Sequence, residues 1–285
     1  MPLHATAETD DVRAGCFRVR VSRHTGRDPD RAPLLLLMGL GGNLEMWQPL
    51  RRLLEEGGGM PTVAVDVPGT GGSPATLLPL PMPLVGWLAT RLLDALELNE
   101  VDVLGLSWGG LLAQQLAVMN PRRVRRLVLI NTNFGVGSVP GRPTALQGAL
   151  EQYRSRMGIA SARDAASSST HPQNPNTCPR TGTRSARPPS RRGLYWQILT
   201  GATWSSIGFL PLLSPPTLVL AGGDDTVCPP VNARILARLI PRARLQVVPG
   251  AGHLLPFESP ELTAAAVLQH LAADHCRFSE VRNER

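Results

Sequence analysis

The sequence contains no lysine, and all 29 of its basic residues are arginine. Cysteine is also scarce, and the four cysteines lie far apart with no CxxC spacing (Cys16, Cys178, Cys228 and Cys276). This spacing argues against both a disulfide framework and a zinc site. Aromatic residues make up only 4% of the chain, so aliphatic side chains must form most of the core. We therefore expect neither a bound metal nor a structural disulfide.

Long hydrophobic runs are missing as well. No apolar run approaches the ~18–20 residues needed to cross a bilayer, so the sequence predicts no transmembrane segment. Residues 1–15, MPLHATAETDDVRAG, lack the basic and apolar regions of a signal peptide. The widely spaced cysteines suit a reducing compartment. Together these absences lead us to expect a cytoplasmic protein.

The net charge of +7 could indicate a nucleic-acid partner, but its distribution argues against one. Residues 161–192 hold six arginines and one aspartate, a net charge of +5. Most of the excess therefore lies in one segment of unusual composition, and not on a folded face where aromatic and basic side chains alternate. We expect no nucleic-acid partner.

Short apolar runs alternate with helical periodicity along most of the chain. The runs are rich in Val and Leu, which is typical of strands buried on both faces of a parallel sheet. They lie at residues 32–39, 61–69, 101–107, 126–132, 216–223 and 244–250. Residues 17–24, FRVRVSRH, alternate apolar with polar and predict a half-exposed edge strand. Helical periods between the runs predict a doubly wound α/β fold with a mostly parallel sheet.

One segment breaks this alternation. Residues 161–192 contain no Val, Ile, Leu, Met, Phe, Tyr or Trp. Such a segment cannot bury enough apolar area to offset the entropy of ordering it, so we expect it to be disordered. It lies inside a long predicted insertion, residues 134–213, that separates two parts of the core, residues 1–133 and 214–285.

Residues 105–109, GLSWG, have the G-x-S-x-G spacing of a nucleophile elbow and lie between a predicted strand and a predicted helix. A tight turn there holds the side chain of Ser107 clear of the sheet, and the helix N-terminus favours developing negative charge. The pentapeptide alone also fits a glycine-rich turn with an inert serine. An acid, a base and an anion-stabilising loop elsewhere in the chain must therefore decide between the two interpretations.

Candidates for the acid and the base follow in the chain order that such a site requires. Asp224 and Asp225 come directly after one predicted strand, and His253 follows the next. Catalytic groups in open α/β sheets gather at the carboxyl ends of the strands. His253 would accept the proton of Ser107 while a carboxylate orients its ring. We choose Asp225 for its spacing from Gly222; Asp224 stays an alternative that could instead cap the next helix.

A glycine-rich loop supplies the fourth part of the predicted site. Residues 34–43, LLLLMGLGGN, run from a predicted strand into this loop. A loop of this kind beside a nucleophile elbow provides a backbone N–H for an oxyanion hole. We assign the two donors to the backbone of Leu40 and of Trp108. A phosphate-binding loop is the alternative, but GLGGN has neither the GxGxxG spacing nor the lysine of a P-loop.

The motifs around these residues resemble those of the α/β-hydrolase superfamily. More narrowly, GLGGNLE, the SWGG elbow and YWQ-x-x-x-G-x-x-W-x-S-I are similar to the intracellular medium-chain-length poly(3-hydroxyalkanoate) depolymerases. The resemblance covers roughly residues 32–158 and 193–270. It implies an α/β-hydrolase fold, no cofactor, and a catalytic triad of Ser107, Asp225 and His253. It also implies that the insertion at residues 134–213 is a cap.

The resemblance also implies a reaction: hydrolysis of ester bonds in a stored polyester, through an acyl-enzyme, at the surface of a storage granule. Residues 159–192 do not resemble the cap of that family. We interpret their abrupt change of composition as a local shift of the reading frame, which resequencing of the coding DNA tests. Two other functions stay open, namely a general carboxylesterase acting on small esters and a non-catalytic protein of granule or lipid surfaces.

Overall fold

The fold is known from a computed structural model, which describes residues 8–28, 31–142, 144, 145, 148, 151 and 189–272. Across these residues, eight strands form one sheet in the order β1-β2-β4-β3-β5-β6-β7-β8. The strands are β1 (Glu8–Ala14), β2 (Phe17–His24), β3 (Leu34–Leu37), β4 (Thr62–Val65), β5 (Val101–Leu106), β6 (Val124–Ile130), β7 (Thr217–Gly222) and β8 (Ala243–Val248). All neighbouring pairs from β4 to β8 are parallel, so the predicted α/β fold with a mostly parallel sheet is confirmed.

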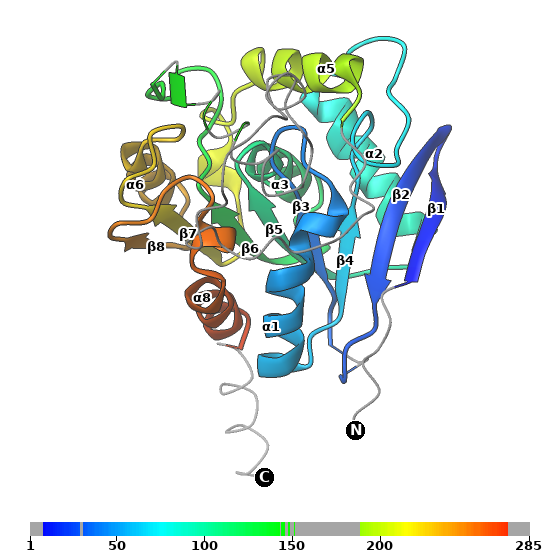
Figure 1. Cartoon of the computed structure of the whole chain (residues 1–285), viewed down its shortest axis with the longest axis horizontal. Coiled ribbons are helices and arrows are strands. Elements are labelled where there is room, and N and C mark those ends of the chain that lie inside the picture. Colours follow the sequence, from blue (N-terminus) through cyan, green and yellow to red (C-terminus); the bar gives the residue numbers. More distant parts are fainter. Residues whose placement is uncertain are drawn as a thin grey trace, which may run out of the picture.

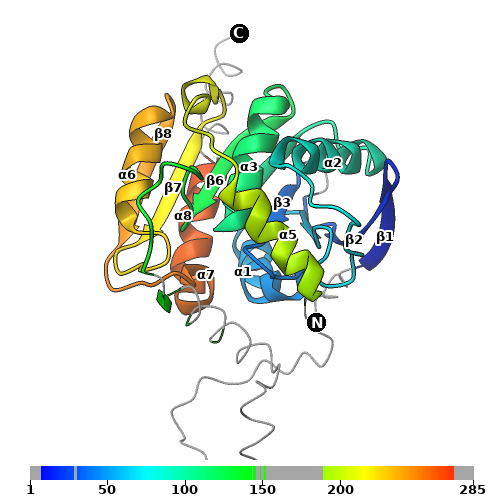
Figure 2. The same cartoon turned by 90° about the horizontal axis from the view of Figure 1, so that it is seen from above.

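Helices cover both faces of the sheet and bury a core against each (Figures 1 and 2). In β3, Leu34 and Leu36 enter one core while Leu35 and Leu37 enter the other, which explains the unbroken apolar run. The first core includes residues of α1 (Gln48–Gly58) and α8 (Pro260–Ala272), and the second includes residues of α2 (Met82–Ala95), α3 (Trp108–Met119) and α6 (Pro230–Leu239). The described fold also contains the short helices η1 (Leu44–Trp47), η2 (Leu210–Leu212) and α7 (Leu255–Glu258).

The prediction of an edge strand at residues 17–24 is wrong in one respect. The strand exists with those bounds, but β2 pairs with β1 on one side and with β4 on the other. The true edge is β1, which periodicity does not reveal because its sequence, ETDDVRA, is mostly charged or polar. Its pairing with β2 is instead supported by ion pairs between exposed side chains, such as Arg23 with Asp10 at 2.6 Å.

The helix α5 (Arg191–Ala202) crosses above the carboxyl edge of the sheet (Figures 1 and 2). It begins inside the segment 161–192, so the prediction of disorder is wrong for the last residues of that segment. The side chain of Ser190 caps the helix by accepting a hydrogen bond from the backbone N–H of Gly193 at 2.9 Å. Residues 161–188 lie outside the described residues, and the domain boundaries stay predictions. No helix in the ranges that the structure describes combines the length and apolarity needed to cross a membrane.

Candidate active site

Ser107 lies in the turn between β5 and α3, with φ 53° and ψ −117°, a conformation that side-chain-bearing residues rarely adopt. Its two flanking glycines are required by close backbone approaches. A Cβ on Gly105 would collide with the backbone of Gly109, and a Cβ on Gly109 would collide with a carbonyl of β3. The turn is held by β6, because the N–H of Ser107 donates to the carbonyl of Ile130 (2.9 Å) and the hydroxyl of Thr132 donates to the carbonyl of Ser107 (2.7 Å).

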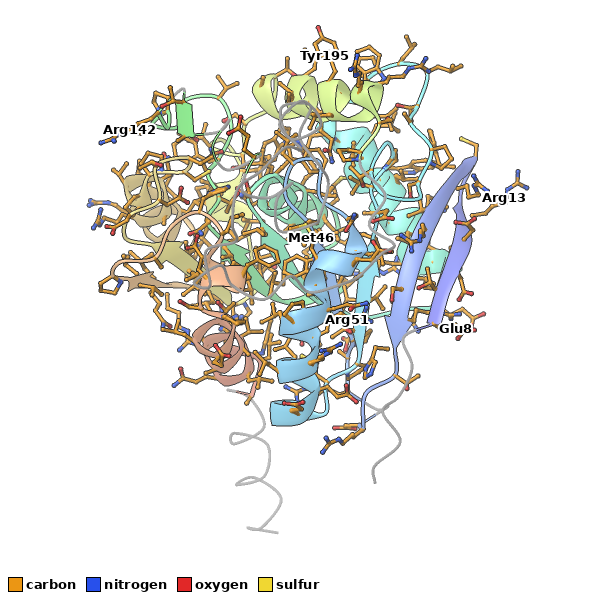
Figure 3. All side chains as sticks on the ribbon, in the orientation of Figure 1. Glu8, Arg13, Met46, Arg51, Arg142 and Tyr195 are labelled. Carbon is orange, nitrogen blue, oxygen red and sulfur yellow. The ribbon has the colours of Figure 1, made fainter. Side chains whose placement is uncertain are left out.

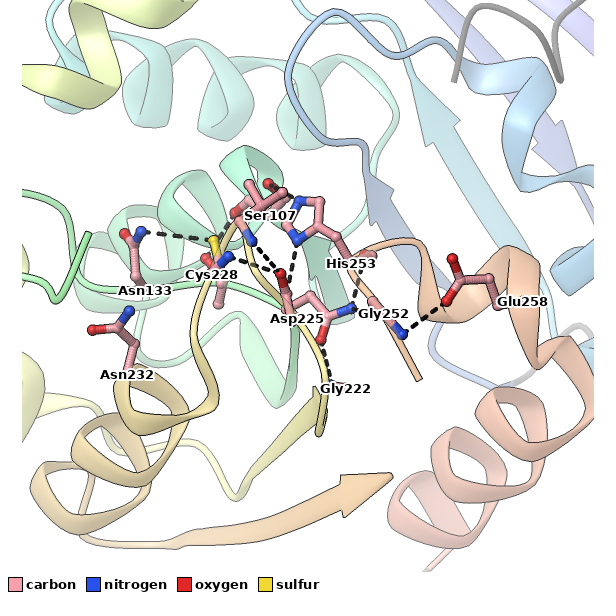
Figure 4. Close-up of polar contacts among 12 residues, drawn as sticks. Ser107, Asn133, Gly222, Asp225, Cys228, Asn232, Gly252, His253 and Glu258 are labelled. Carbon is pink, nitrogen blue, oxygen red and sulfur yellow. Dashed lines mark hydrogen bonds and ion pairs between the residues drawn. The ribbon is translucent and has the colours of Figure 1, made fainter. Parts of the chain in front are cut away.

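The structure brings Ser107, His253 and Asp225 into one chain of hydrogen bonds (Figure 4). The Oγ atom of Ser107 lies 3.0 Å from Nε2 of His253, and Nδ1 of His253 lies 2.8 Å from Oδ2 of Asp225. The three residues follow three different strands, β5, β7 and β8, whose carboxyl ends meet at one edge. This arrangement lets a proton move from the serine to the imidazole while the carboxylate holds the ring.

Of the two candidate carboxylates, only Asp225 contacts the histidine. Its side chain is completely buried, and its second oxygen, Oδ1, accepts hydrogen bonds from the backbone N–H groups of Val227 and Cys228, both at 2.8 Å. Asp224 is exposed, and its backbone N–H donates to the carbonyl of Ala251. The geometry therefore favours Asp225 as the partner of the ring and leaves Asp224 outside the hydrogen-bond chain.

Asn131 is a site residue that the sequence analysis missed. It follows β6 with φ 45°, and its buried side chain ties together the ends of two other strands. Its Oδ1 accepts from the N–H of Gly222 (2.7 Å), and its Nδ2 donates to the carbonyls of Gly252 (2.9 Å) and His253 (2.8 Å). Asn131 thus fixes the loop that carries the histidine. The one signal in the sequence is an asparagine directly after a strand, where left-handed backbone is common for this residue.

The glycine-rich loop lies directly against the nucleophile turn. In this loop, the backbone N–H of Gly42 donates a hydrogen bond to the carbonyl of Gly39 at 3.0 Å. Gly41, between them, has φ +70°, which the third position of a type II turn requires. A Cβ on Gly39 would lie 3.3 Å from the Cβ of Ser107. The two predicted donor residues are therefore close to the serine, since Leu40 is in this turn and Trp108 directly follows Ser107. Trp108 is the first residue of α3, so its backbone N–H has no acceptor within the helix.

A pocket lies beneath α5 and next to Trp108. We call it the α5 pocket. The residues that line it are Val67, Pro68, Thr76, Leu80, Val85, Trp108, Trp196, Gln197 and Thr200. A second cavity, lined only by apolar residues of the sheet, α2, α3 and the loop after β4, borders it because Val67, Pro68 and Val85 line both. Apolar side chains thus form most of the lining of both spaces.

A second reactive group, the thiol of Cys228, belongs to the same loop as Asp225. Burial raises the pKa of the Cys228 thiol far above its usual range, and the nearby charge of Asp225 raises it further. This thiol stays protonated at neutral pH and does not compete with Ser107 as a nucleophile. Within the described ranges, no group of three or more His, Cys, Asp or Glu side chains is placed to hold a metal ion.

Comparisons with known proteins agree with the fold. A family model described as alpha/beta hydrolase fold matches residues 32–260. A poly(3-hydroxyalkanoate) depolymerase from Ectopseudomonas oleovorans is 34% identical over 261 residues, which cover 91% of this chain and 90% of the relative. A 3-oxoadipate enol-lactonase 2 from Acinetobacter baylyi is 26% identical, over 84% of this chain and 88% of the relative.

Solved structures with the same fold include other hydrolases. A hydrolase from Pseudomonas aeruginosa PA01 superposes with a TM-score of 0.70 at 26% identity, covering 93% of this chain and 98% of its own. A thermophilic esterase from Thermogutta terrifontis gives a TM-score of 0.69 at 26% identity, covering 94% of this chain and 99% of its own. The similarity thus extends over nearly the full length of each of these chains.

Proposed function

We propose that this chain, which belongs to the alpha/beta hydrolase fold family, is a serine esterase that forms an acyl-enzyme on Ser107. The observation that carries the proposal is the continuous hydrogen-bond chain from Ser107 through His253 to Asp225. A buried carboxylate that fixes the tautomer of a histidine within 3.0 Å of a serine hydroxyl is the arrangement that activates a serine.

The chemistry follows from the roles of these side chains. Oγ of Ser107 attacks the ester carbonyl while Nε2 of His253 takes its proton, and the negative charge moves to the carbonyl oxygen. The N–H groups of Leu40 and Trp108 stabilise that oxygen, each contributing about 2.7–4 kcal/mol to the transition state. His253 then protonates the departing alcohol. In the second half-reaction His253 activates water, which releases the acid and restores Ser107.

For the substrate we propose an aliphatic poly(3-hydroxyalkanoate) or its oligomers. The relative at 34% identity bears that activity in its name, and the α5 pocket borders a cavity lined only by apolar residues. Each methylene group of such a polymer that becomes buried against apolar side chains of the protein contributes roughly 0.8 kcal/mol to binding. This substrate would place the enzyme in the cytoplasm, at the surface of storage granules.

The surface around the α5 pocket supports a polymeric substrate. Leu77 and Leu78 are 84% and 72% exposed, and Tyr195 on α5 is 60% exposed and points outward (Figure 3). The two segments are adjacent, since the indole N–H of Trp196 donates to the carbonyl of Thr76 at 3.2 Å. Exposed apolar side chains grouped beside a pocket are typical of a surface that meets an apolar partner.

The test of this proposal is hydrolysis of two substrates by the purified protein: a suspension of poly(3-hydroxyoctanoate) and soluble p-nitrophenyl butyrate. Release of 3-hydroxy acids from the polymer supports the proposed function. Hydrolysis of the small ester alone indicates a general carboxylesterase instead. A lack of turnover on both, in protein that also fails to react with a fluorophosphonate probe, indicates a non-catalytic surface protein.

The double variant Leu77→Ser/Leu78→Ser should separate polymer contact from chemistry. We expect its rate on the polymer suspension to fall roughly tenfold, since it removes two exposed apolar side chains beside the pocket, while its rate on p-nitrophenyl butyrate changes less than about twofold. Leu245→Ser/Leu262→Ser is the matched control, because these leucines are also exposed but lie on β8 and α8. An equal loss on the polymer in both double variants would contradict a specific role of Leu77 and Leu78.

A further inference from the structure

Gln197 connects α5 to both parts of the proposed oxyanion hole. Gln197 is only 3% exposed, and its side-chain oxygen Oε1 accepts a hydrogen bond from the backbone N–H of Gly41 at 2.8 Å. Its backbone carbonyl accepts from the indole Nε1 of Trp108, also at 2.8 Å. Gly41 follows Leu40 in the chain, so Gln197 contacts the residue beside one proposed donor and the residue that carries the other.

The orientation of the Gln197 amide is set by these contacts. A backbone N–H can only donate, so the amide oxygen must face Gly41 and the NH₂ group must point elsewhere. Nε2 is buried, and no residue that the structure describes accepts a hydrogen bond from it. A buried amide donor without an acceptor is costly, so a ligand that brings an acceptor to Nε2 would gain binding free energy there.

Gln197 lines the α5 pocket, and the other polar side chains of the described lining already have hydrogen-bond partners. Among the other polar side chains that line it, the hydroxyl of Thr200 donates to the carbonyl of Leu80 at 2.7 Å, and the indole of Trp196 donates to the carbonyl of Thr76. The hydroxyl of Thr76 donates to the carbonyl of Leu78 at 2.6 Å. The described lining thus consists of apolar side chains, of polar side chains that already have partners, and of Gln197, whose buried NH₂ group has no acceptor among the described residues.

We propose that Nε2 of Gln197 donates a hydrogen bond to the oxygen on C3 of the acyl group and so selects 3-hydroxyacyl esters over plain alkanoyl esters. This inference rests on the proposed function. The C3 oxygen is held on the second carbon from the ester carbonyl, which must itself lie between Leu40, Trp108 and Ser107 to react. A donor suits this oxygen both as a free hydroxyl in an oligomer end and as an ester oxygen within a polymer, since each offers a lone pair.

The direct test compares p-nitrophenyl 3-hydroxyoctanoate with p-nitrophenyl octanoate, which differ only at C3. The ratio of their kcat/KM values is divided by the ratio of their rates with hydroxide, which removes the intrinsic difference in reactivity. We expect the normalised ratio to be at least about tenfold in favour of the 3-hydroxy ester for the unchanged protein, the usual gain when a buried donor is satisfied. A normalised ratio near one overturns the proposal.

Two variants of Gln197 separate recognition from support of the loop. Gln197→Glu keeps an oxygen for the N–H of Gly41 but loses the NH₂ donor, whereas Gln197→Met loses both. We expect the normalised ratio to fall about tenfold in both variants, with a larger common loss of kcat on both esters for the methionine variant. Thr200→Val is the matched control in the same pocket. It should keep the normalised ratio, because the hydroxyl of Thr200 already donates to the carbonyl of Leu80.

The outcomes are distinguishable. If Gln197→Glu slows both esters equally and keeps the normalised ratio, Gln197 acts only on the loop and the proposal is overturned. If the unchanged protein hydrolyses neither ester and Ser107 does not react with a fluorophosphonate, the proposed function fails and this inference fails with it. Turnover of the octanoate ester without a preference for the 3-hydroxy ester overturns the inference alone.

Discussion

Replacing Ser107 by alanine should lower kcat for p-nitrophenyl octanoate by about 10⁶-fold, the size of loss typical when the serine of a triad is removed. Alanine lacks the Oγ atom that lies 3.0 Å from Nε2 of His253, so no acyl-enzyme can form. The measurement is steady-state hydrolysis together with labelling by a fluorophosphonate probe. The unchanged protein should be labelled at Ser107, and the variant should not be labelled.

A second variant at the same position separates catalysis from backbone strain. Alanine must keep the unfavourable conformation of Ser107, with φ 53°, whereas glycine adopts it freely. We therefore expect Ser107→Gly to be as inactive as Ser107→Ala but more stable to urea, by about 1 kcal/mol after allowing for the greater freedom of unfolded glycine. Turnover near the original rate in either variant would rule out Ser107 as the nucleophile.

The parts of this molecule that could be predicted are those with strong local signals. The central strands are buried on both faces, so they appear in the sequence as unbroken apolar runs. The glycines of the elbow and of the loop at residues 39–42 mark close backbone approaches that forbid side chains. Strand β1 escapes prediction because its residues are mostly polar, and its place depends on pairing with β2.

Asn131 and Gln197 could not be predicted for a different reason. Their roles depend on hydrogen bonds between residues distant in the sequence: Gln197 and Gly41 are 156 residues apart, and Asn131 and His253 are 122 apart. Neither position has a local pattern that distinguishes a buried amide with these partners from an amide in solvent. Burial and direction of the side chain, which decide the role, exist only once the strands are assembled.

Burial also distinguishes Asp224 from Asp225, because only Asp225 lies inside the fold against His253. Asp225→Asn should lower kcat at neutral pH by about 10⁴-fold, although the change is nearly isosteric. Oδ1 accepts two backbone N–H groups, so the oxygen of the new amide must stay there and its NH₂ group must face Nδ1 of His253. Nδ1 then becomes an acceptor, the ring proton moves to Nε2, and His253 cannot take the proton of Ser107.

The matched control is Asp224→Asn, which makes the same chemical change on the neighbouring residue. Asp224 is exposed and has no contact with the histidine, so we expect kcat within about twofold of the original value, as for most surface substitutions. Both variants should keep the fold, judged by circular dichroism. The Asp225→Asn variant should react with the fluorophosphonate probe far more slowly than the Asp224→Asn variant. If Asp224→Asn were the slower variant, the carboxylate that orients His253 would be Asp224. Equal, small effects of both changes would instead mean that the hydrogen bonds of Asn131 alone suffice to hold the loop of His253 in its active position.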